Sequence, residues 1–159
     1  MRRYGELVLT PTARLAELGI TLPQVVPPLA AYVPASRTGS LVYTAGQLPM
    51  VEGKLPQTGK LGAGVSAEEG YAHARQCALN GLAAVDALVG LDRVVRVVKV
   101  VGFVACEPSF TAHPKVVNGA SDLLGEVFGD AGKHARSAVG VASLPLDAPV
   151  EVELIVEIS

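Results

Sequence analysis

The residues of this chain whose types and spacing best suit chemistry lie between His134 and Ile158, in HARSAVGVASLPLDAPVEVELIVEI. Arg136 is the single arginine at the start of an otherwise uncharged strand pattern. After a corner with two prolines, a second strand pattern carries acids at positions 151, 153 and 157. A guanidinium is a planar fork of hydrogen-bond donors, whereas a carboxylate accepts hydrogen bonds and titrates. A core alone needs neither, so Arg136 and Glu151 are candidate functional residues.

The last strand gives the clearest pattern in the chain. Apolar residues at the even positions from 150 to 158 alternate with three glutamates and one isoleucine, which is the period of a strand with one buried face. We expect this strand to form a hairpin with the strand around Arg136. With Leu144 opposite Val150, Arg136 would lie opposite Ile158 and roughly 23 Å from Glu151, at about 3.3 Å per residue. If both residues act in one site, another subunit must complete it.

The composition indicates one soluble domain that associates with copies of itself. The chain has 159 residues, of which 50% are hydrophobic and only 4% aromatic, with no tryptophan. The core must therefore be built from valine, leucine and alanine, and we expect some apolar surface to be buried between subunits. The net charge of −2 predicts no nucleic-acid partner, because phosphate binding needs clustered basic residues. Arg93, Arg96 and Lys99 form the only loose basic cluster, which we interpret as exposed strand ends.

Other features predict a cytoplasmic protein with no membrane contact. Lys99 interrupts the longest apolar stretch, and the N-terminal residues MRRYGELV lack the apolar run of a signal peptide. Cys77 and Cys106 have no CxxC spacing, so we expect reduced thiols. His73 has no second ligand at helical spacing, which favours a hydrogen-bonded or solvated histidine over a metal ligand. No metal site and no cofactor are predicted.

Two long helices are expected between the strands. Ser66 and Glu69 form a capping box that begins a helix over 66–89, with apolar residues in steps of three and four. A second helix is predicted over 109–128. Asn118 interrupts the apolar side of this helix, so it is either a hydrogen-bonded core group or a site residue.

The remaining segments are predicted to be extended, apart from a short helix over 10–18. Strands are expected over 40–46 and 93–106, and the loop over 51–65 has room for a short strand pair. Four prolines in 22–34 exclude a helix there and predict an extended path or an edge strand. Tyr32, in that segment, is either a buried structural residue or a site residue.

The order of these elements predicts a single α+β domain over 1–159. We expect one mixed β-sheet with both long helices packed on one face, preceded by an N-terminal extension over 1–27 that contains the short helix. Helices on one side leave the other face of the sheet bare. The simplest cover for that face is another subunit.

Three segments resemble the Rid (YjgF-type) family: YVPASRTGSLVYTAGQLP, FTAHPKVVNGASDLL and ARSAVGVASLPLDAPVEVELI. The resemblance covers about 32–158, and the N-terminal residues are similar to those of a longer branch that carries the label endoribonuclease with a chorismate-mutase-like fold. It implies a homotrimer with clefts at the subunit interfaces. Members of the archetypal branch hydrolyse reactive enamines and imines that are formed from amino acids.

The resemblance also implies roles for particular residues. Arg136 matches the arginine that binds the substrate carboxylate, for which a fork of donors is suited. Glu151 matches the acid that positions or activates water. Tyr32, Gly46 and Asn118 match the conserved tyrosine, the glycine whose backbone lines the cleft, and the asparagine of the helix.

Two departures from the family pattern bear on function. Ala45 replaces a serine and Ala138 replaces a cysteine, which leaves a more apolar and roomier substrate site; Cys77 and Cys106 do not fall at the matching position. The resemblance implies a 2-iminobutanoate/2-iminopropanoate (enamine/imine) deaminase or a close variant. The alternatives are a non-catalytic trimer that binds small carboxylate-bearing metabolites and, as a minor one, an endoribonuclease. Chorismate mutase activity is disfavoured, because a shared fold does not carry a site with it.

Overall fold

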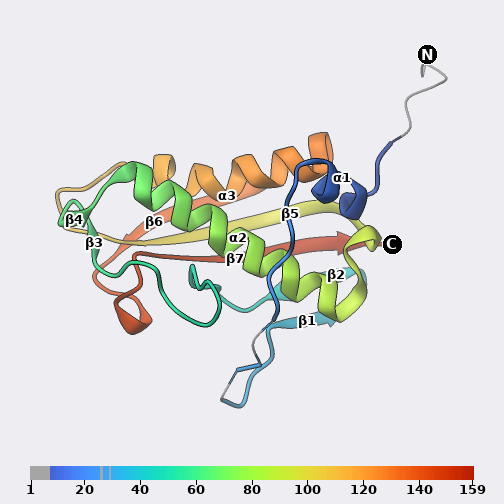
Figure 1. Cartoon of the computed structure of the whole chain (residues 1–159), viewed down its shortest axis with the longest axis horizontal. Helices are drawn as coiled ribbons and strands as arrows, with labels where there is room; N and C mark the ends of the chain where they lie inside the picture. Colours follow the sequence, from blue (N-terminus) through green and yellow to red (C-terminus); the bar gives the residue numbers. More distant parts are fainter. Residues whose placement is uncertain (1–7, 26, 29) are drawn as a thin grey trace.

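The computed structural model describes residues 8–25, 27–28 and 30–159. Helices and strands follow one another along the chain as the colours of Figure 1 trace. The elements are α1 (Pro11–Glu17), β1 (Ala35–Thr38), β2 (Leu41–Thr44), β3 (Lys60–Leu61), β4 (Gly64–Val65), α2 (Ala67–Val89), β5 (Val94–Ala105), α3 (His113–Phe128), β6 (Ala135–Val141) and β7 (Val150–Ile158).

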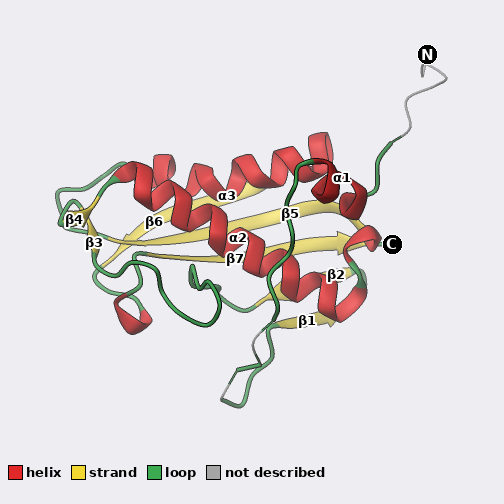
Figure 2. Ribbon diagram, in the orientation of Figure 1, coloured by secondary structure: helices red, strands yellow, loops and turns green. Residues whose placement is uncertain are grey.

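The main sheet has five strands in the order β1-β2-β7-β5-β6. Strands β5 and β6 pair in parallel, and the other neighbours pair antiparallel. Figure 2 shows α2 and α3 lying over the same face of this sheet. The predicted α+β class, with one mixed sheet and two long helices on one face, is therefore confirmed, and α1 is a third, short helix. The trimer stays a prediction.

The core lies between the sheet and the two long helices. The even positions of β7 are buried and the odd positions are only half-buried, as the alternation predicts. On the helical side, the predicted capping box is present: the Ser66 hydroxyl accepts from the Glu69 amide, and the Glu69 carboxylate accepts from the Ser66 amide. Leu82 and Leu154 are among the largest fully buried side chains. Burial of the even side of β7 leaves Glu151 on the face opposite the helices.

The predicted hairpin between the last two strands is wrong. Strand β5 lies between β6 and β7, so Arg136 pairs with Val100 rather than with Ile158. The alternation of a strand fixes which residues share a face, but it does not identify the neighbouring strand. The chain between β6 and β7 is a long corner containing a 3-10 turn at Pro145–Asp147, and it carries the chain past β5.

The second long helix begins at His113, four residues after the predicted start at Ser109. Pro114 explains the difference. A proline is tolerated in the first turn of a helix, where its missing N–H would have had no partner, but not in the interior. Residues before His113 form a turn instead, in which the Phe110 amide donates to the Glu107 carbonyl at 2.9 Å.

The proline-rich segment over 22–34 has no regular secondary structure in its described residues, and the edge strand β1 begins just after it. Tyr32 is 60% exposed, which excludes a buried structural role for it within one chain. Val26 and Leu29, in the same segment, lie outside the described residues. Among the helices that the structure describes, none is long and apolar enough to cross a membrane.

Candidate functional site

Arg136 lies on the edge strand β6 with its side chain on the face covered by α3. It pairs with Val100, which pairs in turn with the buried Leu154 of the helix-covered face. The Arg136 Nη1 donates to Asn118 Oδ1 at 2.8 Å and to Ser121 Oγ at 3.1 Å, both on α3. Within the described residues the guanidinium forms no ion pair. Its charge is therefore oriented by neutral oxygens and stays available to an anion.

Asn118 is exposed and accepts a hydrogen bond from Arg136, so it is not a core group. Ala138 follows Arg136 on the same face of β6, since alternate residues of a strand share a face. It is partly buried against the core. The structure thus brings together three of the predicted site residues: Arg136, Asn118 and Ala138.

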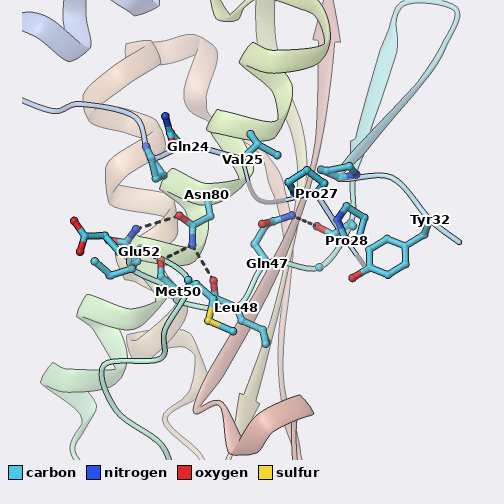
Figure 3. Close-up of a pocket in the computed structure, with 17 residues that line it drawn as sticks. Gln24, Val25, Pro27, Pro28, Tyr32, Gln47, Leu48, Met50, Glu52 and Asn80 are labelled. Carbon is cyan, nitrogen blue, oxygen red and sulfur yellow. Dashed lines mark hydrogen bonds between the residues drawn. The ribbon is translucent and has the colours of Figure 1, made fainter. Parts of the chain in front are cut away.

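A second group of predicted residues lines a groove at the other edge of the sheet. Tyr32, Ala45 and Gly46 line a cavity of about 770 Å³ together with residues of the proline-rich segment, the loop after β2 and helix α2. Figure 3 shows Tyr32 on one side of this groove, with Gln47 and Asn80 nearer its centre. Asn80 Nδ2 donates to the carbonyls of Leu48 at 2.9 Å and Met50 at 3.1 Å. These bonds attach the loop that forms one wall of the groove to α2.

Glu151 belongs to this second group through Gly46. A Cβ added to Gly46 would lie only 1.9 Å from Glu151 Oε1, so the carboxylate occupies the space that a side chain would need. Two backbone hydrogen bonds between Gln47 and Val152, at 2.8 and 3.0 Å, hold the loop against β7 at this point. Burial, and secondly the like charge of Glu153, raise the pKa of Glu151. A carboxyl group with a raised pKa is suited to exchange protons with a substrate.

The two groups do not meet within one chain. Arg136 pairs with Val100 and Glu151 pairs with Phe103, so the two residues are about 10 Å apart along the strands and about 10 Å across them. They also point to opposite faces of the sheet. The distance of roughly 23 Å, expected from the hairpin, is wrong, but the separation of Arg136 from Glu151 in one chain follows from the observed topology.

Two residues beside Arg136 escaped the sequence analysis. Ser121 Oγ lies 2.9 Å from His134 Nε2, and His134 Nδ1 lies 2.6 Å from the Gly132 carbonyl. Spacing alone could have indicated both. Ser121 lies three residues after Asn118 on one helix face, and His134 lies two residues before Arg136, immediately before β6 begins.

His73, Cys77 and Cys106 belong to neither of the two groups of site residues. His73 is buried and forms one hydrogen bond, at 2.7 Å, with Gln57. Of the two predicted states, hydrogen-bonded or solvated, it is the hydrogen-bonded one. Cys77 is buried, and this burial raises the pKa of its thiol well above the usual range. Burial also raises the pKa of Cys106, whose sulfur lies 3.4 Å from His113 Nε2. Neither thiol is poised as a thiolate nucleophile.

Comparison with known proteins gives consistent matches along most of the chain. The sequence profile of the family described as "YjgF/chorismate mutase-like, putative endoribonuclease" matches residues 12–158. Protein TCP17 of Trypanosoma cruzi is 48% identical over 149 residues, which cover 92% of this chain and 93% of that protein.

Solved structures give the same result. The protein Atu1372 of Agrobacterium tumefaciens, of unknown function, is 46% identical with a TM-score of 0.87, over 94% of this chain and 92% of that one. A putative endoribonuclease from Shewanella oneidensis is 39% identical with a TM-score of 0.89, over 94% and 100%. More distantly, Escherichia coli TdcF with bound serine is 25% identical with a TM-score of 0.63, over 86% and 94%. On the strength of the profile match and these relatives, the chain belongs to the YjgF/chorismate mutase-like family.

Proposed function

We propose that this protein is an imine/enamine deaminase that hydrolyses carboxylate-bearing imines in clefts between the subunits of a homotrimer. The observation that carries the proposal is the Arg136 guanidinium, which is held by two neutral oxygens and paired with no acid in the described residues. Such a fork matches a carboxylate bidentately. The relative TdcF has been solved with bound serine, whose carboxylate is the group that a 2-imino acid also carries.

The proposed reaction adds water across a C=N bond. The Glu151 carboxylate takes a proton from water as the water oxygen attacks the carbon of the protonated imine, and a neutral carbinolamine forms. Glu151 returns that proton to nitrogen and then accepts the hydroxyl proton as the C–N bond breaks, so the products are a 2-oxo acid and ammonia. Arg136, on the edge strand β6, and Glu151, on the central strand β7, point to opposite faces of the sheet in one chain. The proposal therefore places Arg136 of one subunit beside Glu151 of another.

A second candidate is a trimer that binds small carboxylates without catalysis. The observation that favours it is the apolar character of the positions around the cleft, where Ala45 and Ala138 offer no hydroxyl or thiol. An assay with 2-aminoacrylate, generated during the measurement by a pyridoxal-phosphate dehydratase acting on serine, separates the two candidates. The deaminase releases ammonia and pyruvate faster than buffer does; a rate equal to that of buffer, with carboxylate binding intact, favours the binding protein.

Endoribonuclease activity receives less support from the charges. Arg96 forms an ion pair with Glu157 at 2.6 Å, and Arg93 donates to the Ser159 carbonyl. The loose basic cluster is therefore partly used within the chain, and the net charge of −2 provides no field that would attract phosphates. If the protein protects bound RNA in a footprinting experiment and this protection falls steeply with added salt, RNA binding would be favoured over the binding of small carboxylates.

The proposed role of Glu151 predicts the pH dependence of kcat/KM. A general base is inactive when protonated, so activity should fall as the pH drops through the pKa of Glu151, which burial and Glu153 raise. The acid limb should therefore lie above the pH range in which an exposed glutamate titrates. Glu153→Gln removes the like charge and should move the limb to lower pH.

Glu151→Gln should lower kcat by about 10²–10⁴-fold; a profile for Glu151→Gln that matches the wild type would contradict this role.

A further inference from the structure

The surroundings of Arg136 contain a chain of hydrogen bonds that the proposed reaction does not itself require. His134 Nδ1 lies 2.6 Å from the Gly132 carbonyl, which can only accept, so Nδ1 carries the proton and donates it. The neutral ring then presents Nε2 as an acceptor. At 2.9 Å from Nε2, the Ser121 hydroxyl donates to it. The lone pairs of Ser121 Oγ remain for Arg136 Nη1, at 3.1 Å.

We infer that Ser121 and His134 are positioning residues, which hold the Arg136 guanidinium so that its Nε–Nη2 edge faces the ligand carboxylate. This inference rests on the carboxylate-binding role proposed above for Arg136. Both hydrogen bonds of Arg136 to α3 use Nη1. Nε and Nη2 have no partner in the part of the chain that the structure describes, and together they form a side-on fork for two carboxylate oxygens.

The chemistry of the holding groups supports this role. A carboxylate partner would orient Arg136 but would also compete with the carboxylate of the ligand, whereas a hydroxyl and an amide oxygen orient it without neutralising it. The nearest acid along α3, Asp122, is turned away, since it accepts from Tyr71 Oη at 2.6 Å. A long arginine side chain on an edge strand loses rotamer freedom on binding unless it is held beforehand. Ser121 and His134 supply that restraint.

The test compares ligand affinity with turnover in the full-length protein. Ser121→Ala and His134→Phe should each weaken the binding of pyruvate, a stable 2-oxo acid, about 10-fold by calorimetry. Each should raise KM for 2-iminopropanoate by a similar factor and leave kcat within about twofold. The double variant should be no weaker than either single variant, because both act through one chain of hydrogen bonds.

Conservative variants and a control distinguish positioning from a structural effect. Ser121→Thr keeps the hydroxyl and His134→Gln keeps an acceptor, so both should bind pyruvate within about threefold of the wild type. Ser109→Ala, in the exposed turn before α3, should change nothing. Binding within twofold of the wild type in Ser121→Ala and His134→Phe would overturn the inference, as would a wild type that binds no pyruvate. If the wild type binds pyruvate but hydrolyses no imine, the proposed reaction fails while the calorimetry still decides this inference.

Discussion

Replacement of Arg136 by alanine is expected to lower kcat/KM for 2-iminopropanoate by about 100- to 10,000-fold. The variant loses two charge-assisted hydrogen bonds to the substrate carboxylate, each contributing about 1.5–3 kcal/mol, and about 1.4 kcal/mol corresponds to a factor of ten. Arg136→Lys keeps the charge but not the planar fork, so we expect an intermediate loss of about 10-fold. Steady-state kinetics with the imine generated during the assay measures both values.

The fold should survive this substitution, since Arg136 is on an edge strand and only partly buried. Circular dichroism and thermal unfolding of Arg136→Ala should match the wild type. Activity retained within about threefold in a folded Arg136→Ala variant would refute the role of this residue, because no other cation of the described residues lies in either group of site residues.

The largest expected effect on stability is that of Gly119→Ala. Gly119 is buried where α3 crosses α2, and a Cβ there would lie 2.0 Å from the Tyr71 carbonyl oxygen. The clash is with backbone, which no side-chain rotation relieves. The helices must separate, so we expect a loss of about 3 kcal/mol in the free energy of unfolding, at the upper end of the usual range for overpacking. Denaturant titration at fixed protein concentration measures it.

Gly125→Ala is the matched control for this prediction. Gly125 lies on the same helix, is exposed, and would place its Cβ in open space. Alanine in place of Gly125 reduces the conformational freedom of the unfolded chain and adds no clash in the helix. We therefore expect a gain of about 0.5–1 kcal/mol in the free energy of unfolding. If Gly119→Ala and Gly125→Ala change the free energy of unfolding equally, the close approach of α3 to α2 is not the reason for a glycine at position 119.

Local rules predicted most of the elements. The capping box at Ser66 placed the start of α2 correctly, and the alternation along 150–158 identified the buried side of β7. The start of α3 was predicted too early, because Glu107-Pro108-Ser109 has the composition of a helix start; Pro114 was the stronger signal. The partner of β7 could not be predicted, because an alternating strand can pair on either side with any strand of matching faces.

The residues of the candidate site could be named from the sequence, and their roles stay predictions; their geometry could not be predicted. Residue types and the family resemblance identified Arg136 and Glu151, yet they did not reveal that β5 separates the two strands. The orienting pair of Ser121 and His134 needed the packing of α3 against β6, which joins residues far apart in sequence. The exposure of Tyr32 excludes a buried structural role within one chain, and its role as a site residue stays a prediction.

Complementation between two inactive variants tests the central claim most directly. Arg136→Ala and Glu151→Gln are refolded together in equal amounts, with separate tags to verify that mixed trimers form. If each cleft takes Arg136 from one subunit and Glu151 from another, half of the arginines and half of the glutamates are intact. About a quarter of the clefts then contain both residues, and the mixture should recover about a quarter of the wild-type rate. A mixture of verified mixed trimers that stays as inactive as its separate components would contradict the account.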